Sequence, residues 1–281
     1  MEYNWKEFCI SQIPNMKARF KQIMGREPDL VNPKRFTDKL EWLKAYDSTF
    51  LKSICADKIL VRDYVKEKLG EDISIPLLGV YDKFDDIDFS KLPNDYVMKT
   101  NHGSQTNILV HNSQINKNLA KIKFEEWLSK DWSWWGYEMF YKPIKKKILI
   151  EEFMNNDDKV ALTDYKFSCF NGKPKICQVM NDRFTNSLHF NYYDMNFKPL
   201  TYISRTDHPA NYTLKDEKPK TWDLMIEYAR KLSEDFKYVR VDLYQINGKV
   251  YFGELTFIPA AAYIKYTDDK IDFILGEMLK L

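Results

Sequence analysis

The feature that most constrains this chain is a pair of short strands near its C-terminus, each with one acid in an apolar, β-branched run. The strands are predicted at residues 238–246 and 249–257, and Asn247-Gly248 between them is a strong hairpin signal. The acids are Asp242 and Glu254. A carboxylate in such a run is costly unless a cation pairs with it. Two carboxylates arriving together suit a divalent ion such as Mg²⁺, so the hairpin predicts a metal site.

The register of this hairpin decides whether the two acids meet. A two-residue loop pairs Ile246 with Lys249 and puts the acids on opposite faces, because side chains alternate along a strand. A three-residue loop pairs Gln245 with Lys249, and both acids then share one face with Arg240 and Thr256. We predict the three-residue loop. From the acids alone, an edge hairpin with two solvated carboxylates is an equally good interpretation.

Two lysines upstream lie in settings that suit anions. Lys99 ends a predicted strand at residues 95–100 and opens into a loop of short polar residues, whose backbone N–H groups can bind phosphate oxygens. Lys166 lies in a strand between Tyr165 and Phe167, where a lysine that faces a pocket favours an anion. The Walker pattern GxxxxGK[ST] is absent, so a P-loop fold is not expected.

Together with two further segments, these lysines and acids follow an order that resembles the ATP-grasp superfamily, and the resemblance implies a nucleotide site. The run Glu151-Glu152-Phe153-Met154 ends a strand and is interpreted as a hinge whose backbone contacts an adenine edge, with Asp157 or Asp158 near the ribose. Arg240 shares a strand face with Asp242 and is placed to hold a γ-phosphate through two N–H bonds. Each signal is weak by itself, and only the ordered set is specific.

Bulk properties exclude several classes of protein. The chain has 281 residues and a net charge of +2, so its charge does not favour nucleic acid as a partner. No signal peptide is expected, and no apolar run approaches the ~20 residues that cross a bilayer. Its four cysteines form no CxxC pair and its four histidines show no zinc spacing. We expect a cytoplasmic enzyme.

The pattern along the chain predicts an α+β fold with several small sheets. A helix is expected from residue 37 to 46 with Thr37 or Asp38 as its cap, and a second from 56 to 69 closed by Gly70. Further expected elements are strands at 75–81 and 148–153, helices at 117–130 and 222–236, and a hairpin at 166–180 that turns at Asn171-Gly172.

A tryptophan-rich segment at residues 127–135 precedes a basic run at 142–147. Such residues favour membrane interfaces, so peripheral membrane contact is one interpretation. Packing between lobes next to a solvated basic turn is the preferred one, because no amphipathic helix is visible here.

The polar loop expected after the 166–180 hairpin carries Arg183 and His189. An arginine suits bidentate capture of a carboxylate or phosphate, and binding residues are often found on loops. We therefore expect both residues at the acceptor substrate; an exposed loop arginine without a role is the alternative.

Four strings resemble the TupA-like ATP-grasp family, which is linked to teichuronopeptide and capsular polysaccharide biosynthesis. They lie at residues 32–44, 56–65, 99–104 and 253–257. The resemblance implies two α+β lobes that sandwich ATP behind a helical N-terminal extension. It implies domains at 1–50 (extension), 51–154 (first lobe) and 155–281 (second lobe).

The resemblance also implies roles for single residues. Lys99, Gly103, Ser104 and Lys166 would bind ATP phosphates, Glu151, Glu152, Phe153 and Met154 the adenine, and Asp242 and Glu254 Mg²⁺; Arg240, Lys166 and His102 would act in catalysis. Two departures are a second glycine missing from the phosphate loop and a Pro259-Ala260-Ala261-Ala262 run where relatives tend to be glycine-rich.

The activity that follows is carboxylate–amine ligation. A carboxylate attacks the γ-phosphorus of ATP, and an amine or amino acid then displaces phosphate from the acyl phosphate. The resemblance implies a uronic acid of a surface polysaccharide as the acid, and the oligomeric state stays open. Alternatives are a kinase that stops at a phosphorylated acceptor, a glycosyltransferase whose acids hold a sugar nucleotide, and a binding module without catalysis. Asp242→Asn and Glu254→Gln are expected to leave stability without ligand unchanged or raised, because two repelling carboxylates are relieved.

Overall fold

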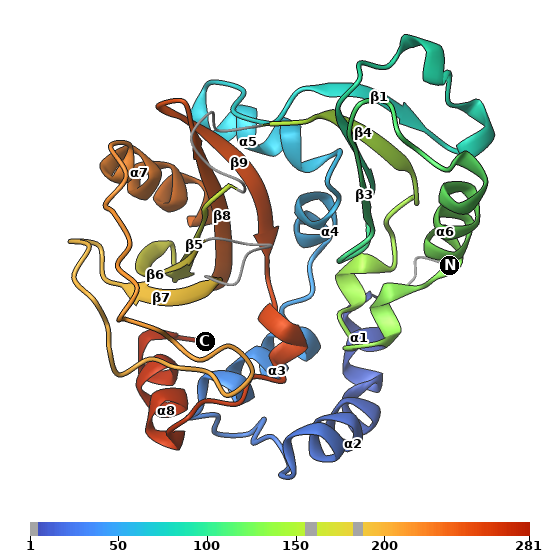
Figure 1. Cartoon of the computed structure of the whole chain (residues 1–281). Coiled ribbons are helices and arrows are strands. Elements are labelled where there is room, and N and C mark those ends of the chain that lie inside the picture. The colour runs from blue at the N-terminus through green and yellow to red at the C-terminus, as the bar shows by residue number, and fades with distance from the viewer. Residues whose placement is uncertain (1–4, 155–161, 182–187) are drawn as a thin grey trace.

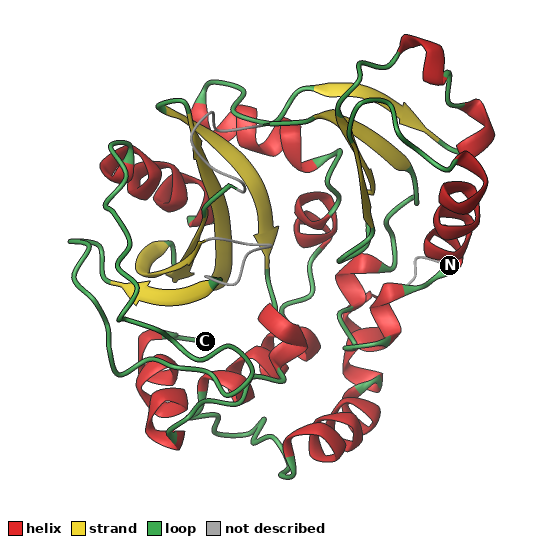
Figure 2. Ribbon diagram, viewed as in Figure 1, coloured by secondary structure: helices red, strands yellow, loops and turns green. Residues whose placement is uncertain are grey.

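A computed structural model describes residues 5–154, 162–181 and 188–281. Figures 1 and 2 show two antiparallel sheets with helices around them. The four-stranded sheet has the order β1-β4-β2-β3, and the five-stranded sheet the order β7-β6-β5-β8-β9. The strands are β1 Leu77–Tyr81, β2 Tyr96–Thr100, β3 Asn107–Val110, β4 Ile148–Glu152, β5 Asp164–Phe170, β6 Lys173–Asn181, β7 His189–Tyr193, β8 Tyr238–Ile246 and β9 Lys249–Thr256.

The helices surround these sheets and separate them. Helices α4 and α5 lie between the two sheets, and α6 lies beside the four-stranded sheet (Figure 1). The bounds are α1 Trp5–Ser11, α2 Ile13–Met24, α3 Phe36–Tyr46, α4 Phe50–Ala56, α5 Val61–Leu69, α6 Lys117–Ser129, α7 Trp222–Ser233 and α8 Asp269–Met278. No helix within the described ranges is long and apolar enough to span a bilayer.

Each sheet has its own hydrophobic core. The smaller core joins the four-stranded sheet to α6, through buried side chains such as Met98, Ile150 and Phe124. The larger core joins the five-stranded sheet to α3, α4, α5, α7 and α8. The α+β class is confirmed. The domain limits at residues 50 and 154 stay predictions, although α4 and α5 contribute to the larger core.

Several predicted turns and ends are confirmed, and two strands were missed. Asn171-Gly172 turns between β5 and β6, and Gly70 ends α5 in the left-handed conformation at φ 79°. Strands β3 and β7 were not predicted. Both are short, β3 with only three apolar residues after Asn107 and β7 with polar residues among its aromatic ones, so their sequence signal is weak.

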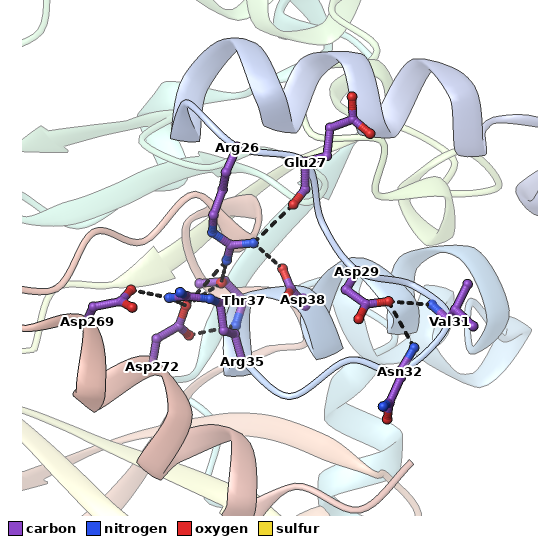
Figure 3. A network of polar contacts seen from close by, with 10 residues as sticks. All are labelled: Arg26, Glu27, Asp29, Val31, Asn32, Arg35, Thr37, Asp38, Asp269 and Asp272. Carbon is purple, nitrogen blue, oxygen red and sulfur yellow. Dashed lines mark hydrogen bonds and ion pairs between the residues drawn. The ribbon is translucent and has the colours of Figure 1, made fainter.

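The predicted cap of α3 is wrong, because α8 caps this helix from outside (Figure 3). Helix α3 begins at Phe36, so Thr37 lies in its first turn. The Thr37 N–H donates to Asp272 Oδ1 at 2.9 Å, and the Thr37 hydroxyl donates to Asp272 Oδ2 at 2.6 Å. Arg26 donates to Asp38 Oδ1 at 2.6 Å and to Thr37 Oγ1 at 2.7 Å. A carboxylate from α8 thus does what a local cap does elsewhere.

The predicted loop of the β8–β9 hairpin is also wrong, but its consequence is confirmed. The turn has two residues, Asn247 at φ 48° and Gly248 at φ 76°, and Ile246 pairs with Lys249. A β-bulge then leaves Gly253 without a partner on β8, since Leu243 pairs with Phe252 and Asp242 with Glu254. As a result, Asp242 lies opposite Glu254, and Arg240 lies opposite Thr256.

Glycine is required at the bulge because the chain is crowded there. A Cβ on Gly253 would lie 2.9 Å from Tyr244 Cε2 and 3.0 Å from the carbonyl oxygen of Asp242. One extra residue shifts every later side chain of β9 to the other face. The bulge therefore brings the two acids onto one face in spite of the two-residue turn.

Candidate active site

A cleft of ≈ 880 Å³ lies between the two sheets and is lined by side chains from both. Among the described residues, its lining cations are Lys58, Arg62, Lys99, Lys166, Arg205 and Arg240, and its lining acids are Glu151, Asp164, Asp242 and Glu254. Apart from a histidine, six cationic side chains thus face four carboxylates. The surplus of positive charge favours a polyanionic ligand such as a polyphosphate.

Asp242 lies at the centre of the densest ionic network in this cleft. Its side chain is 2% exposed. Arg240 donates to both of its oxygens, from Nε at 2.6 Å and from Nη2 at 2.6 Å, and Lys166 Nζ donates to Oδ2 at 2.7 Å. Burial acts to lower the pKa of Lys166, but the negative charges of Asp242, Asp164 and Glu254 together outweigh it, so the pKa is raised. Both cations therefore stay charged and hold the carboxylate between them.

Glu254 is the more accessible acid of the pair. Its side chain is 45% exposed, and its Oε1 accepts bonds from Arg240 Nη2 at 3.1 Å and Thr256 Oγ1 at 3.2 Å. Burial acts to raise its pKa, but the positive charges of Arg240, Lys58 and Lys166 outweigh this and lower the pKa to about 2. Glu254 is therefore ionised throughout the physiological pH range.

The donors around the two acids fit a divalent cation that also takes oxygens from its substrate. Asp242 and Glu254 are cross-strand neighbours with the Thr256 hydroxyl beside them. Three or more His, Cys, Asp or Glu side chains do not gather in metal-binding geometry anywhere in the described part of the chain. Mg²⁺ commonly uses one or two carboxylates and takes its other ligands from phosphates and water, so this donor set matches Mg²⁺.

Lys99 reaches the cleft from the four-stranded sheet, where Glu151 holds it. Lys99 Nζ donates to Glu151 Oε2 at 2.5 Å, and Arg62 Nη2 donates to Oε1 at 2.7 Å. Glu151 is buried in β4 with both oxygens engaged. Its side chain thus fixes two cations at the rim, and any contact with adenine would have to come from its backbone.

The remainder of the predicted adenine hinge faces elsewhere. The side chains of Glu152 and Phe153 line a separate hollow of ≈ 530 Å³, and the Phe153 ring packs edge-on against His111 at 4.5 Å. Met154 is half-buried, and Asp157 and Asp158 lie outside the described residues. The hinge stays a prediction that rests on backbone groups after β4.

The predicted phosphate loop lines the cleft at Gly103 and Ser104. A Cβ on Gly103 would lie 2.6 Å from Thr106 Oγ1 and 2.8 Å from Thr100 Oγ1, so this position also requires glycine. Lys58 Nζ donates to the Gly103 carbonyl at 2.7 Å. Lys58 had been assigned no role from sequence, although it lies in one of the family-like strings.

His102 is buried beside this loop rather than in the cleft. Its ring has no hydrogen-bond partner among the described residues, and it lines the pocket next to the cleft. Burial lowers its pKa to about 4. The imidazole is therefore neutral at pH 7. The predicted catalytic role of His102 stays a prediction.

His189 does not lie in a polar loop, as predicted, but begins strand β7. Its Nε2 lies 2.9 Å from Asp216 Oδ1, and Asn191 and Tyr193 on the same strand face also bond to Asp216. Its neighbour Phe190 lines the cleft instead. Because side chains alternate along a strand, His189 faces away from the cleft. Arg183 lies outside the described residues.

A second pocket of ≈ 360 Å³, here called the inner pocket, adjoins the cleft. It shares Arg240, Glu254 and Lys58 with the cleft and continues inward past them. Its other lining residues include Trp132, Trp135, Glu138, Tyr141, Ala260 and Ala261. The tryptophan-rich segment thus packs in part against the interior, while Trp134 and Trp135 remain 41% and 54% exposed.

The departure at residues 259–262 has a structural counterpart at the wall of this pocket. Ala260, Ala261 and Ala262 have φ of 47°, 49° and 67°, in the left-handed region that favours glycine. Lys44 Nζ donates to the Ala261 carbonyl at 2.7 Å and forms a fully buried ion pair with Glu41. The buried pair thus supports a strained turn that sequence analysis saw only as a change of composition.

Known proteins resemble this chain in sequence and in fold. The family model described as TupA-like ATPgrasp matches residues 38–280. A search of curated proteins finds no match. Among solved structures, D-alanine-D-alanine ligase from Helicobacter pylori is 16% identical at a TM-score of 0.44, with 81% of this chain and 62% of that chain covered.

Two other ligases are similarly distant. D-alanine–D-alanine ligase from Bacillus anthracis, complexed with ATP, is 15% identical at a TM-score of 0.44, with 80% of this chain and 63% of that chain covered. L-amino acid ligase from Bacillus licheniformis is 14% identical at a TM-score of 0.43, with 76% of this chain and 43% of that chain covered. This chain therefore spans less than two thirds of each ligase, and the likenesses carry no argument about activity. The family model alone decides the family, and by it the chain belongs to the TupA-like ATP-grasp family and has an ATP-grasp fold.

Proposed function

We propose that this protein is an ATP-dependent ligase that joins a carboxylate to an amine. The observation that carries the proposal is the cleft, which cations from two facing sheets line together with a pair of adjacent carboxylates. Membership of an ATP-grasp family makes ATP the matching polyanion. Uronic-acid groups of a surface polysaccharide or its precursor, modified in the cytoplasm, are our proposal for the acid.

The side chains divide the work within the cleft. Lys99 from one sheet and Lys166 from the other would bind ATP phosphates, with the Gly103-Ser104 backbone between them. Asp242 and Glu254 would hold Mg²⁺, which when bound neutralises charge on the β- and γ-phosphates. In this structure Arg240 and Lys166 neutralise Asp242. We infer that both cations turn toward phosphate oxygens when ATP binds.

Arg240 is the residue we assign to the transferred phosphoryl group. Its planar guanidinium already makes two parallel bonds to a carboxylate, and the same fork fits two oxygens of a phosphoryl group. The substrate carboxylate attacks the γ-phosphorus and forms an acyl phosphate with release of ADP. The amine then attacks the acyl carbon, and phosphate leaves. The protein contributes mainly positioning and charge stabilisation.

Product analysis tests this function. With Mg-ATP, glucuronate and an amino acid, the ligase reaction must release ADP and phosphate only when both acid and amine are present. Release of AMP would contradict the mechanism. A phosphorylated acceptor that accumulates without an amine would instead identify a kinase, which uses the same ATP site. Protection against heat by UDP-sugars and not by ATP would favour a glycosyltransferase.

A further inference from the structure

Glu138 is a carboxylate without a partner that faces the inner pocket. The side chain is half-buried, and no described residue forms a hydrogen bond or ion pair with its carboxylate. It lies close to Gly136, where an added Cβ would be 3.0 Å from Glu138 Oε2 and 2.5 Å from Ala261 Cβ. An ionised carboxylate withdrawn from water is costly unless a cation pairs with it. A positively charged ligand in the pocket would supply that cation.

The walls around Glu138 are aromatic. Trp132, Trp135 and Tyr141 line the same pocket. The Trp132 Nε1–H is buried and has no acceptor in the described part of the chain. Unsatisfied buried donors are rare in folded proteins and call for an explanation such as a ligand or water. Aromatic faces together with an acid are the usual surroundings of an organic ammonium group.

The position of the pocket relates it to the proposed chemistry. Arg240 and Glu254 line both the cleft and the inner pocket, so the pocket opens at the end of the cleft where the γ-phosphate is proposed to lie. An acyl phosphate formed there would have one side toward ADP and the other toward this pocket. The second substrate must approach from the side that ADP does not occupy.

We propose that the inner pocket binds the amine substrate as its ammonium form, with the Glu138 carboxylate as the ammonium partner and proton acceptor. This inference rests on the proposed ligase function. Glu138 takes one proton from R–NH₃⁺ and becomes a carboxylic acid. The lone pair of the resulting R–NH₂ forms the C–N bond to the acyl carbon while the C–O bond to phosphate breaks. The second proton leaves nitrogen with the phosphate, which departs as HPO₄²⁻.

The acidity of Glu138 suits this role. Burial raises its pKa to about 7, an effect that Lys44 opposes and Glu41 reinforces. A base with a pKa near the working pH is ionised in a useful fraction and releases its proton readily. The other titratable or charged groups packed around the pocket are Glu41 and Lys44 of α3, Cys55 of α4, Lys58, His102, Tyr137, Tyr141, Arg240 of β8, Glu254 of β9 and Tyr263.

The pKa values of these neighbours limit which groups change charge between pH 6 and pH 8. His102 has a pKa of about 4 and Glu254 a pKa of about 2, so neither changes charge between pH 6 and pH 8. Glu41 is also an acid whose pKa burial raises, and Lys44 is bound to it. Replacement of Glu138 alone therefore decides which acid controls amine binding.

Binding of small probes tests the inference without knowledge of the natural amine. Propylammonium, 1-propanol and propionate are nearly isosteric, and their binding at pH 8 can be measured by calorimetry with saturating Mg-ADP. We expect saturable binding of propylammonium only, weakened about tenfold in Glu138→Gln and about tenfold on lowering the pH to 6 in the wild type. Glu126→Gln, at an exposed acid paired with Lys130, is the matched control and should bind as the wild type does.

Several results would overturn the inference. They are equal binding of propylammonium and propanol, preferential binding of propionate, no saturable propylammonium binding up to about 100 mM, or unchanged affinity in Glu138→Gln. Mg-ATP binding is measured separately on the same proteins. Failure to bind Mg-ATP contradicts the proposed function, whereas intact Mg-ATP binding with unaltered amine binding in Glu138→Gln contradicts only the role of Glu138.

Discussion

Replacing the two acids of the hairpin by their amides should have very different effects on stability. Asp242 is 2% exposed and accepts three short charged hydrogen bonds, whereas Glu254 is 45% exposed and accepts one from Arg240 at 3.1 Å. These contacts lead us to replace the expectation that relief of repulsion between the acids keeps or raises stability. Each acid is hydrogen-bonded to a cation, so attraction to that cation outweighs repulsion between the two carboxylates.

The size of the effect follows from these contacts. Removal of one partner of a buried ion pair costs about 3–5 kcal/mol. Asparagine keeps one carbonyl acceptor, and Lys166 retains Asp164 at 3.0 Å, so we expect Asp242→Asn to lower the free energy of unfolding by about 2–4 kcal/mol. Glu254→Gln removes a solvent-screened contact and should cost at most about 1 kcal/mol.

Urea and thermal denaturation without nucleotide or Mg²⁺ measure this difference. The Asp242→Asn loss corresponds to a fall in Tm of roughly 4–16 °C. Asp86→Asn, at an exposed acid in a short turn, is the control and should change stability by less than about 0.5 kcal/mol. Both site variants should lose activity by about 10² or more, since each removes a proposed metal ligand. If Asp242→Asn is as stable as the wild type, or more so, the ionic network does not stabilise the fold as argued.

Four further predictions concern positions that the tertiary structure singles out. Lys44→Met should destabilise by about 3–5 kcal/mol in urea denaturation, because it strands the buried Glu41, and the double variant with Glu41→Leu should recover much of that loss. Gly253→Ala should cost about 1–3 kcal/mol and weaken Mg-ATP binding measured by calorimetry, because its methyl group would meet backbone at 3.0 Å; a fully active variant would contradict the bulge argument. Ala260→Gly should stabilise by about 0.5–1 kcal/mol, since glycine relieves a φ of 47° but loses more chain entropy, and a loss of stability would refute strain at this turn. His102 has a pKa of about 4 in the folded protein against an ordinary value of 6.5, so the unfolded chain takes up a proton first as the pH falls. Between pH 7 and pH 4 the free energy of unfolding of the wild type should therefore fall by about 3 kcal/mol more than that of His102→Gln. Parallel curves of stability against pH would contradict a buried neutral imidazole.

Much of the fold could be predicted from local sequence. Asn171-Gly172 and Asn247-Gly248 specify tight turns because both residues accept positive φ, and Gly70 ends a helix for the same reason. Alternating apolar residues predict the central strands of both sheets. The order of charged residues, from Lys99 to Glu254, indicated the ATP-grasp superfamily, and four short strings indicated the family, because such positions are recognised by type and order without coordinates.

The pairing of charges could not be predicted, since it joins residues that are distant in the chain. The sequence indicated Glu151 as part of a hinge, but its carboxylate binds Lys99 and Arg62 across two other elements. It indicated Asp242 as a free metal ligand, but Arg240 and Lys166 neutralise it. Even when the surrounding sequence is known, a side chain in a strand can lie on either face of the sheet and can pair with many partners. Only tertiary packing selects among them.

The sequence by itself thus determined which chemical groups the chain carries, where its strongest turns lie and that Asp242 and Glu254 enter one hairpin. Only the tertiary structure decided their register, because the bulge at Gly253 arises where β9 passes close to Tyr244 and the backbone of Asp242. It also decided that Glu138 faces the inner pocket, since segments far apart in sequence must pack together to form that pocket. Local preferences act over a few residues, whereas a site of this kind is set by which surfaces exclude water together.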